Sequence, residues 1–149
     1  MNGLTLRDAS PDDARVVCDL IGQLAEFEEM ADLVAITPEM MATELGSEDR
    51  AASVVLAEVD GRVAGMALYV WTFSTFLGRR GIWLEDLIVD PAFRRRGVAT
   101  ALLDELRRRS PGRVEWEVLD WNRGAIELYE RQGAKAHTGW IKYRVDPGP

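Results

Sequence analysis

An apolar run followed by a basic, glycine-containing loop and then a helix is the feature that most constrains this chain. The run covers residues 84–89. The loop and the first helical turn are Arg94, Arg95, Arg96, Gly97, Val98, Ala99 and Thr100. The first N–H groups of a helix lack intrahelical partners and carry the positive end of its dipole. Glycine lets a ligand approach the backbone, and arginine adds charge. Residues 94–97, which we call the arginine loop, are therefore predicted to bind a ligand that carries phosphates.

Length and composition indicate one globular domain over residues 1–149, large enough to bury a core. No apolar run is long enough to span a membrane, and residues 1–8 lack the layout of a signal peptide. The single cysteine, Cys18, has no partner for an intrachain disulfide. We expect a cytoplasmic protein that does not bind membranes.

The charge is distributed unevenly along the chain, whose net charge is −7. Residues 1–60 contain 14 acidic and 3 basic side chains, whereas residues 61–149 contain 11 acidic and 15 basic ones. This asymmetry suits a site that meets a cation on one side and phosphates on the other, although an unevenly charged solvated surface would look the same. The overall acidity argues against a nucleic-acid partner.

The hydrophobic pattern predicts an α/β fold in which helices cover one mixed sheet, in the order β-α-α-β-β-β-α-β-α-β. Helices are expected to start at Ser10-Pro11 and at Thr37-Pro38. Two more are expected over 97–109 and from Asn122, as N-cap, to about 132. Strands are expected over 4–7, 52–59, 63–71, 82–89, 114–119 and 140–145. Asp60-Gly61 predicts a tight hairpin, and residues 77–81 predict a second turn.

Several familiar signatures are missing from the sequence. Neither GxGxxG nor GxxxxGK[ST] occurs, which argues against Rossmann and P-loop nucleotide sites. One histidine, His137, and one cysteine cannot assemble a zinc site of the usual types, so we expect no metal. No GxSxG elbow is present either, and we interpret His137 as a loop residue.

The motif Arg94-x-x-Gly97-x-Ala99 matches the pattern [QR]-x-x-G-x-[GA]. Before it stands Leu87-Ile88-Val89-Asp90-Pro91, and after it come an amphipathic helix, Trp121-Asn122 and the stretch from Tyr129 to Ala134. In this order the motifs resemble the GCN5-related N-acetyltransferase (GNAT) family over essentially the whole chain. The resemblance implies acetyl-CoA as co-substrate.

A narrower resemblance is to the diamine (spermidine/spermine-type) and thialysine acetyltransferases. It rests on residues 24–30 (LAEFEEM), on residues 84–89 (LEDLIV), and on Trp121-Asn122 with Leu128-Tyr129. Thr75 stands where the spermine enzymes tend to carry an aspartate, and the stretch before Gly139-Trp140 lacks their acidic residues. The acceptor is therefore better described as a primary amine than as a long polyamine.

The resemblance also assigns roles to residues. Cofactor contacts fall on Leu87, Ile88, Val89, Arg94, Arg95, Arg96, Gly97, Val98, Ala99, Thr100, Asn122 and Ala125. Substrate contacts fall on Phe27, Glu28, Glu85, Asp86, Trp116 and Glu117. Glu85 would be the general base and Tyr129 the general acid.

Each of these roles has a structural alternative. Tyr129 has the helical spacing of a core tyrosine, and Asn122 has the position of an ordinary N-cap. Glu28 would suit a solvated helix end, and Glu85 or Asp86 an ion pair or a solvent-facing sheet surface. Adjacent strand residues point to opposite faces, so Glu85 and Asp86 reach one pocket only if a bulge intervenes.

The chemistry requires a proton acceptor, because a primary amine with a pKa of about 10.4 is almost wholly protonated at pH 7. A glutamate with its ordinary pKa of about 4.3 is a weak base, so Glu85 needs burial or a water chain. Transfer of a proton from Tyr129, with a pKa of about 10, to a thiolate, with a pKa of about 8.5, is uphill by only about 2 kcal/mol.

The sequence thus predicts an acetyl-CoA-dependent N-acetyltransferase that acts on a small diamine, polyamine or lysine analogue by direct attack on the thioester. Two alternatives remain open, a protein or peptide N-acetyltransferase and a non-catalytic acyl-CoA-binding regulatory module. The family commonly forms dimers, so a homodimer is expected.

Overall fold

The computed structural model describes residues 3–149, whose contacts group into two units. The first unit ends at Glu117 and holds the sheet and three helices. The second, Val118–Pro149, holds one helix and the C-terminal segment.

The first unit is built on one five-stranded sheet in the order β1-β2-β3-β4-β5. The strands are β1 (Leu4–Asp8), β2 (Ala52–Val59), β3 (Arg62–Ser74), β4 (Arg79–Val89) and β5 (Val114–Glu115). Neighbours from β1 to β4 are antiparallel, and β4 and β5 are parallel. The mixed sheet of the predicted fold class is confirmed.

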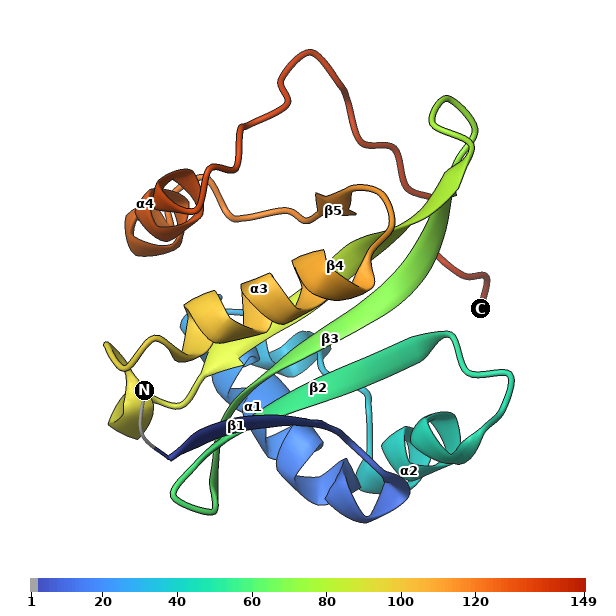
Figure 1. The fold of residues 1–149 in the computed structure, drawn as a ribbon. Helices are drawn as coiled ribbons and strands as arrows, with labels where there is room; N and C mark the ends of the chain where they lie inside the picture. Colours follow the sequence, from blue (N-terminus) through green and yellow to red (C-terminus); the bar gives the residue numbers. More distant parts are fainter. Residues whose placement is uncertain (1–2) are drawn as a thin grey trace. The chain divides into compact units, whose positions relative to one another are not determined.

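Helices cover both faces of this sheet. They are α1 (Ala14–Phe27), α2 (Pro38–Gly46) and α3 (Val98–Arg109), with short 3-10 turns η1 (Pro11–Asp13), η2 (Ala31–Leu33) and η3 (Pro91–Phe93). Figure 1 shows α1 and α2 on one face and α3 on the other. The expected start signals operate locally. The Thr37 side chain accepts the Met40 N–H at 3.2 Å, and Ser10 precedes η1 in a capping box.

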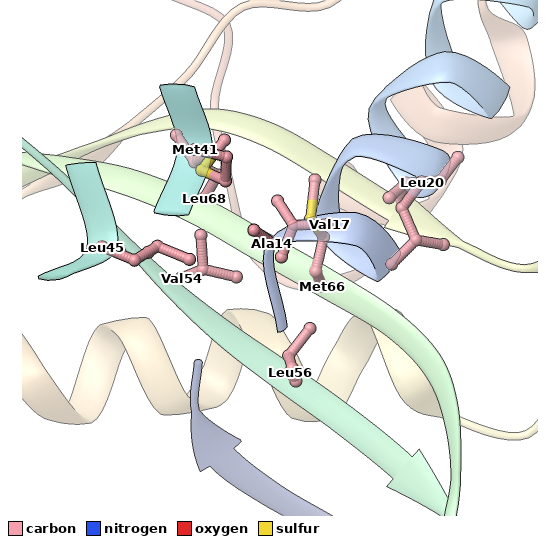
Figure 2. Close-up of a cluster of buried hydrophobic side chains, with 10 residues drawn as sticks. Ala14, Val17, Leu20, Met41, Leu45, Val54, Leu56, Met66 and Leu68 are labelled. Atoms are coloured by element: carbon pink, nitrogen blue, oxygen red, sulfur yellow. The ribbon is translucent and has the colours of Figure 1, made fainter. Parts of the chain in front are cut away.

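The hydrophobic core on the α1 side draws on two helices and three strands. Figure 2 shows α1 and α2 side chains packed on those of β2 and β3, and Ile88 of β4 belongs to the same cluster. On the opposite face, α3 buries Leu102, Leu103 and Leu106 completely. Each fully buried leucine contributes about 1.5–3 kcal/mol through removal of its side chain from water. Strand β4 is thus held between two packed layers.

The two observed hairpin turns agree only in part with the turns predicted from the sequence. Asp60 and Gly61 both have positive φ, as the predicted two-residue turn between β2 and β3 requires. The second turn comes earlier than expected, because β4 begins at Arg79 instead of residue 82. Its backbone reverses at Gly78, whose φ is +66° and whose N–H donates to the Ser74 carbonyl oxygen. The outer ends of β3 and β4, next to this turn, remain paired although their residues do not belong to the core.

The second unit contains α4 (Arg123–Arg131), which the sequence placed correctly. The Asn122 side chain caps it by accepting the Ala125 N–H at 3.2 Å, and Gly133, with φ +86°, follows its end. None of these described helices combines the length and the apolar character needed to cross a bilayer.

Two strand predictions at this end of the chain are wrong. The strand expected over 114–119 is only Val114–Glu115, and the one expected over 140–145 is absent from the described chain. Alternating hydrophobicity is a local property, whereas a strand exists only when its backbone pairs with another strand. Residues 140–145 have the pattern without the pairing.

Candidate functional site

A β-bulge interrupts β4 where its two acidic residues stand. Leu68 of β3 pairs with Asp86, and the next residue, Tyr69, pairs with Leu84. Glu85 is therefore the extra residue of the bulge, without an opposite number on β3. The condition under which Glu85 and Asp86 reach the same side of the sheet is met.

Both carboxylates lie on the face that α1 covers. Asp86 is opposite Leu68, a member of the core cluster beneath α1. Before the bulge, Trp83 is on this face too, because it pairs with Val70, whose other neighbour, Ala52, packs on that cluster. The Trp83 indole N–H donates to Glu85 Oε1 at 3.3 Å, which keeps Glu85 beside it.

The environment changes the acidity of these groups. Burial, with smaller contributions from the negative charges of Glu85 and Glu28, raises the pKa of Asp86 to about 6. Glu28 is the C-cap of α1, and burial raises its pKa as well. Glu28, Glu85 and Asp86 form what we call the acidic cluster. A carboxyl that titrates near pH 6 is a stronger proton acceptor than an ordinary aspartate.

The edge of β4 toward β5 is mostly unpaired. Only Ile82 and Trp83 pair with β5, through Val114 and Glu115. From Leu84 to Val89, no strand of the described chain continues the ladder along this edge. These residues can offer backbone N–H and C=O groups to an extended ligand, as in strand addition.

The arginine loop follows β4 and has the backbone of an anion site. Arg94 is extended, and Arg95 and Gly97 have φ of +63° and +76°. Left-handed residues in a loop of this kind are typical of anion-binding backbone nests. Gly97 is the N-cap of α3, and its carbonyl oxygen accepts the Ala101 N–H at 2.9 Å. Upstream, the Asp90 carboxylate accepts the Ala92 N–H and fixes the start of η3. The loop thus presents N–H groups and the N-terminus of α3 to solvent.

A cavity of about 650 Å³ lies between the end of α1 and the start of the arginine loop. Its lining residues are Gln23, Glu26, Phe27, Ile88, Asp90, Pro91, Ala92 and Arg94. Phe27 is half-exposed at this opening. The α1 wall of the cavity carries the Glu26 carboxylate, and the wall that follows β4 carries both the Asp90 carboxylate and the Arg94 guanidinium.

This geometry agrees with the comparison of the chain with known families. The sequence model of the acetyltransferase (GNAT) family matches residues 21–134, which include β4, the arginine loop and α4. The chain belongs to the GNAT family. It is an N-acetyltransferase, and GNAT acetyltransferases use acetyl-CoA as co-substrate.

Curated relatives of this GNAT chain span nearly its whole length. It is 35% identical to a thialysine N-epsilon-acetyltransferase of Caenorhabditis elegans, over 98% of this chain and 94% of that protein. An L-ornithine N5-acetyltransferase of Arabidopsis thaliana is 27% identical over 94% of this chain and 83% of its own length.

The GNAT fold also appears among solved structures. An integron cassette protein from the mobile metagenome of V. cholerae aligns with a TM-score of 0.79 at 20% identity, over 99% of this chain and 94% of that one. A metagenomic aminoglycoside acetyltransferase in complex with sisomicin aligns with a TM-score of 0.76 at 15% identity, over 97% and 98%. At these identities the likeness concerns the fold.

The structure places the predicted site residues of this GNAT chain in three groups. The acceptor residues Phe27 and Glu28 end α1, on the face of the sheet that carries Glu85 and Asp86. Most predicted cofactor residues lie on the open edge of β4, in the arginine loop and in the first turn of α3. Asn122, Ala125 and the half-buried Tyr129 belong to α4 and its cap in the second unit.

Trp116 and Glu117 follow β5 outside any strand, the former half-buried and the latter exposed. Among residues 3–149, no three His, Cys, Asp or Glu side chains are placed so that together they could hold a metal ion.

Sequence reasoning missed three residues of this region. Trp83 was not among the predicted site residues, yet its indole N–H donates to Glu85. Gln23 and Asp90 had no role, although both line the cavity and the Gln23 amide donates to Asp90 at 3.5 Å. No local signal marks Gln23, since only the packing of α1 on β4 brings it to Asp90.

Proposed function

We propose that this N-acetyltransferase moves an acetyl group from acetyl-CoA to a small primary amine, such as a diamine, a polyamine or a lysine analogue. The observation that carries the proposal is the pair of oppositely charged regions on β4, the acidic cluster at the bulge and the arginine loop at the strand end. An ammonium group suits the first and a pyrophosphate the second. The thialysine and ornithine acetyltransferases among the relatives act on amines of this class.

In this proposal the arginine loop and the first turn of α3 bind the pyrophosphate through backbone N–H groups. The unpaired edge at Leu87–Val89 pairs with the pantetheine arm, as an added strand would. Asn122 and Ala125 contribute from the start of α4. These contacts orient the thioester without a covalent enzyme intermediate.

The acidic cluster removes the proton from the amine. Glu85 is the proposed base, and Asp86 the charge that orients the ammonium. The pKa of about 6 at Asp86 supports a proton-accepting role for this residue as well, since it gives the carboxylate roughly 100-fold more affinity for a proton than an ordinary aspartate has. Substitution of each residue alone distinguishes the two assignments.

Tyr129 is the proposed general acid that protonates the departing thiolate. It stands near the end of α4, where its backbone carbonyl oxygen accepts the Ala134 N–H. A phenol can stabilise the developing thiolate by a hydrogen bond before the proton is transferred.

The protein is further proposed to act as a homodimer. In the C-terminal segment, Trp140, Ile141 and Tyr143 are 85%, 79% and 88% exposed. Contiguous apolar exposure of this kind marks interaction surfaces.

A direct test measures release of free thiol from acetyl-CoA with a panel of diamines, polyamines, amino acids and peptides. Turnover with small amines is expected. Turnover only with peptides would favour a protein acetyltransferase, and binding of acetyl-CoA without turnover a regulatory module.

The matched substitution is Tyr129→Phe, with Tyr143→Phe as control. Loss of the general acid should lower kcat by about 100-fold and leave acetyl-CoA affinity nearly intact. The control removes an exposed hydroxyl, keeps the aromatic ring in the C-terminal segment, and should leave kcat unchanged. An unchanged rate in Tyr129→Phe would refute the assignment of the acid.

A further inference from the structure

Arg62, which lies outside the arginine loop, contacts the same aromatic ring as Arg96 of the loop, the ring of Phe93. The guanidinium carbon of Arg62 is 5.0 Å from the centre of the Phe93 ring, and that of Arg96 is 5.7 Å from it. Both distances are in the range of cation–π contacts. Phe93 itself is buried at 5% exposure, so it is a fixed platform for two exposed charges.

Arg62 precedes Arg94 by 32 residues in the sequence, and the pairing of β3 with β4 brings it beside the arginine loop. β3 begins at Arg62 and runs antiparallel to β4, so its first residues lie beside the end of β4, where Gly65 pairs with Val89. The Asp90 N–H donates to the Ala64 carbonyl oxygen at 2.8 Å and fixes η3, with Phe93, against the start of β3. No signature of the loop includes this position.

The charges of this region are not neutralised by neighbours. Among residues 3–149, no carboxylate forms an ion pair with Arg62, Arg94, Arg95 or Arg96, which we call the arginine cluster. The nearby Asp90 carboxylate is occupied by the Ala92 N–H and the Gln23 amide. Two guanidinium groups at one ring repel each other, and an anion between or beside them would offset that repulsion.

The number of charges exceeds what a pyrophosphate held by backbone requires. Coenzyme A carries a pyrophosphate and, on its ribose, a separate 3′-phosphate monoester. Backbone N–H groups of the arginine loop and the α3 N-terminus suit the pyrophosphate. A planar guanidinium is suited to bidentate recognition of a phosphate monoester.

We propose that Arg62, held against Phe93 beside Arg96, binds the 3′-phosphate of coenzyme A. The protein then distinguishes coenzyme A from its 3′-dephospho form through a residue that the loop motif does not contain. This inference rests on the proposed use of acetyl-CoA by this chain.

The test compares the affinities of coenzyme A and 3′-dephospho-coenzyme A by calorimetry, without turnover. Wild type should bind coenzyme A about tenfold or more tightly than the dephospho form. Arg62→Gln should lose about tenfold in affinity for coenzyme A and nothing for the dephospho form. Arg62→Lys should retain part of the difference, since it keeps the charge but loses the planar fork. Arg80→Gln, an exposed arginine at the opposite end of β4, is the matched control and should change neither affinity.

Equal affinities of wild type for the two ligands, or equal losses for both in Arg62→Gln, would overturn the inference and leave the proposed function standing. If wild type binds neither ligand, the inference is overturned together with the proposed function. Because Arg62 is exposed, the melting temperature of Arg62→Gln should stay at the wild-type value, which separates lost binding from lost folding.

Discussion

The acidic cluster lies at the bulge of strand β4 and the arginine cluster lies beyond the end of that strand, and the two clusters hold their charges in opposite ways. Asp86 is packed beside the core residues Leu68 and Ile88, and burial moves its pKa toward neutrality. The arginines stand exposed at the strand end. Burial tunes the proton affinity of a carboxylate, which matters where a proton is to be moved. Exposure leaves a cation permanently charged, which matters where phosphates are to be held. One strand thus supports two kinds of chemistry.

The largest predicted effect is a loss of catalytic rate on substitution in the acidic cluster, and it tests the contrast between the two clusters directly. Asp86→Asn and Glu85→Gln should each be examined through the pH dependence of kcat/KM. Loss of the proton acceptor should reduce the rate by about 100-fold, and loss of an orienting charge by less. Wild type should show an inflection near pH 6 if ionisation of Asp86 controls the rate. The substitution that abolishes the inflection identifies the base, and a profile unaffected by both would place the base elsewhere.

The second prediction concerns stability and requires no substrate. The pKa of Asp86 is about 6 in the folded protein and about 3.9 in an unfolded chain, so the folded state binds the proton more tightly. Wild type should therefore lose stability relative to Asp86→Asn as the pH rises from 4 to 6. The difference should level off above pH 6 at no more than about 3 kcal/mol.

Urea denaturation of both proteins at pH 4, 5, 6 and 8 measures this difference. A difference that stays constant over the series would show that Asp86 has an ordinary pKa. The contrast between a carboxylate with a raised pKa and permanently charged arginines would then be lost.

The third and smallest effect is expected in the arginine loop. Gly97→Ala places a side chain at φ +76° and narrows the approach to the α3 N-terminus. It should raise KM for acetyl-CoA by about tenfold. Gly78→Ala has the same backbone cost at φ +66°, with open space around the added carbon, at the tip of the β3–β4 hairpin. This control should lose about 1 kcal/mol of stability and keep its KM. Equal KM changes in both variants would show that strain, and not ligand approach, is responsible.

Features that depend on neighbouring residues could be predicted from the sequence. Thr37 caps α2 and Asn122 caps α4 because each side chain needs only an N–H three residues away. Asp60-Gly61 turns the chain because both residues tolerate positive φ. The family motif and the succession of elements up to α4 rest on such local rules and on hydrophobic periodicity.

Features that depend on pairing between distant segments were beyond the sequence. The strand expected over 140–145 has the alternating pattern of a strand but no partner in the described chain. The bulge at Glu85 arises from the register between β3 and β4, to which both strands contribute. Arg62 and Gln23 likewise come to the site through contacts with residues more than thirty and sixty positions away.

By itself the sequence determined the family, the mixed α/β architecture, the basic loop before α3 and the presence of two acidic residues on one strand. The tertiary structure alone decided that a bulge turns both of these acids toward α1, and that Asp86 is half-buried whereas Glu85 is exposed. It also brought Arg62 to the ring of Phe93. The physical reason is the same in each case. A turn or a cap is set by interactions within a few residues, whereas burial, strand register and charge proximity are set by whichever distant segment packs alongside.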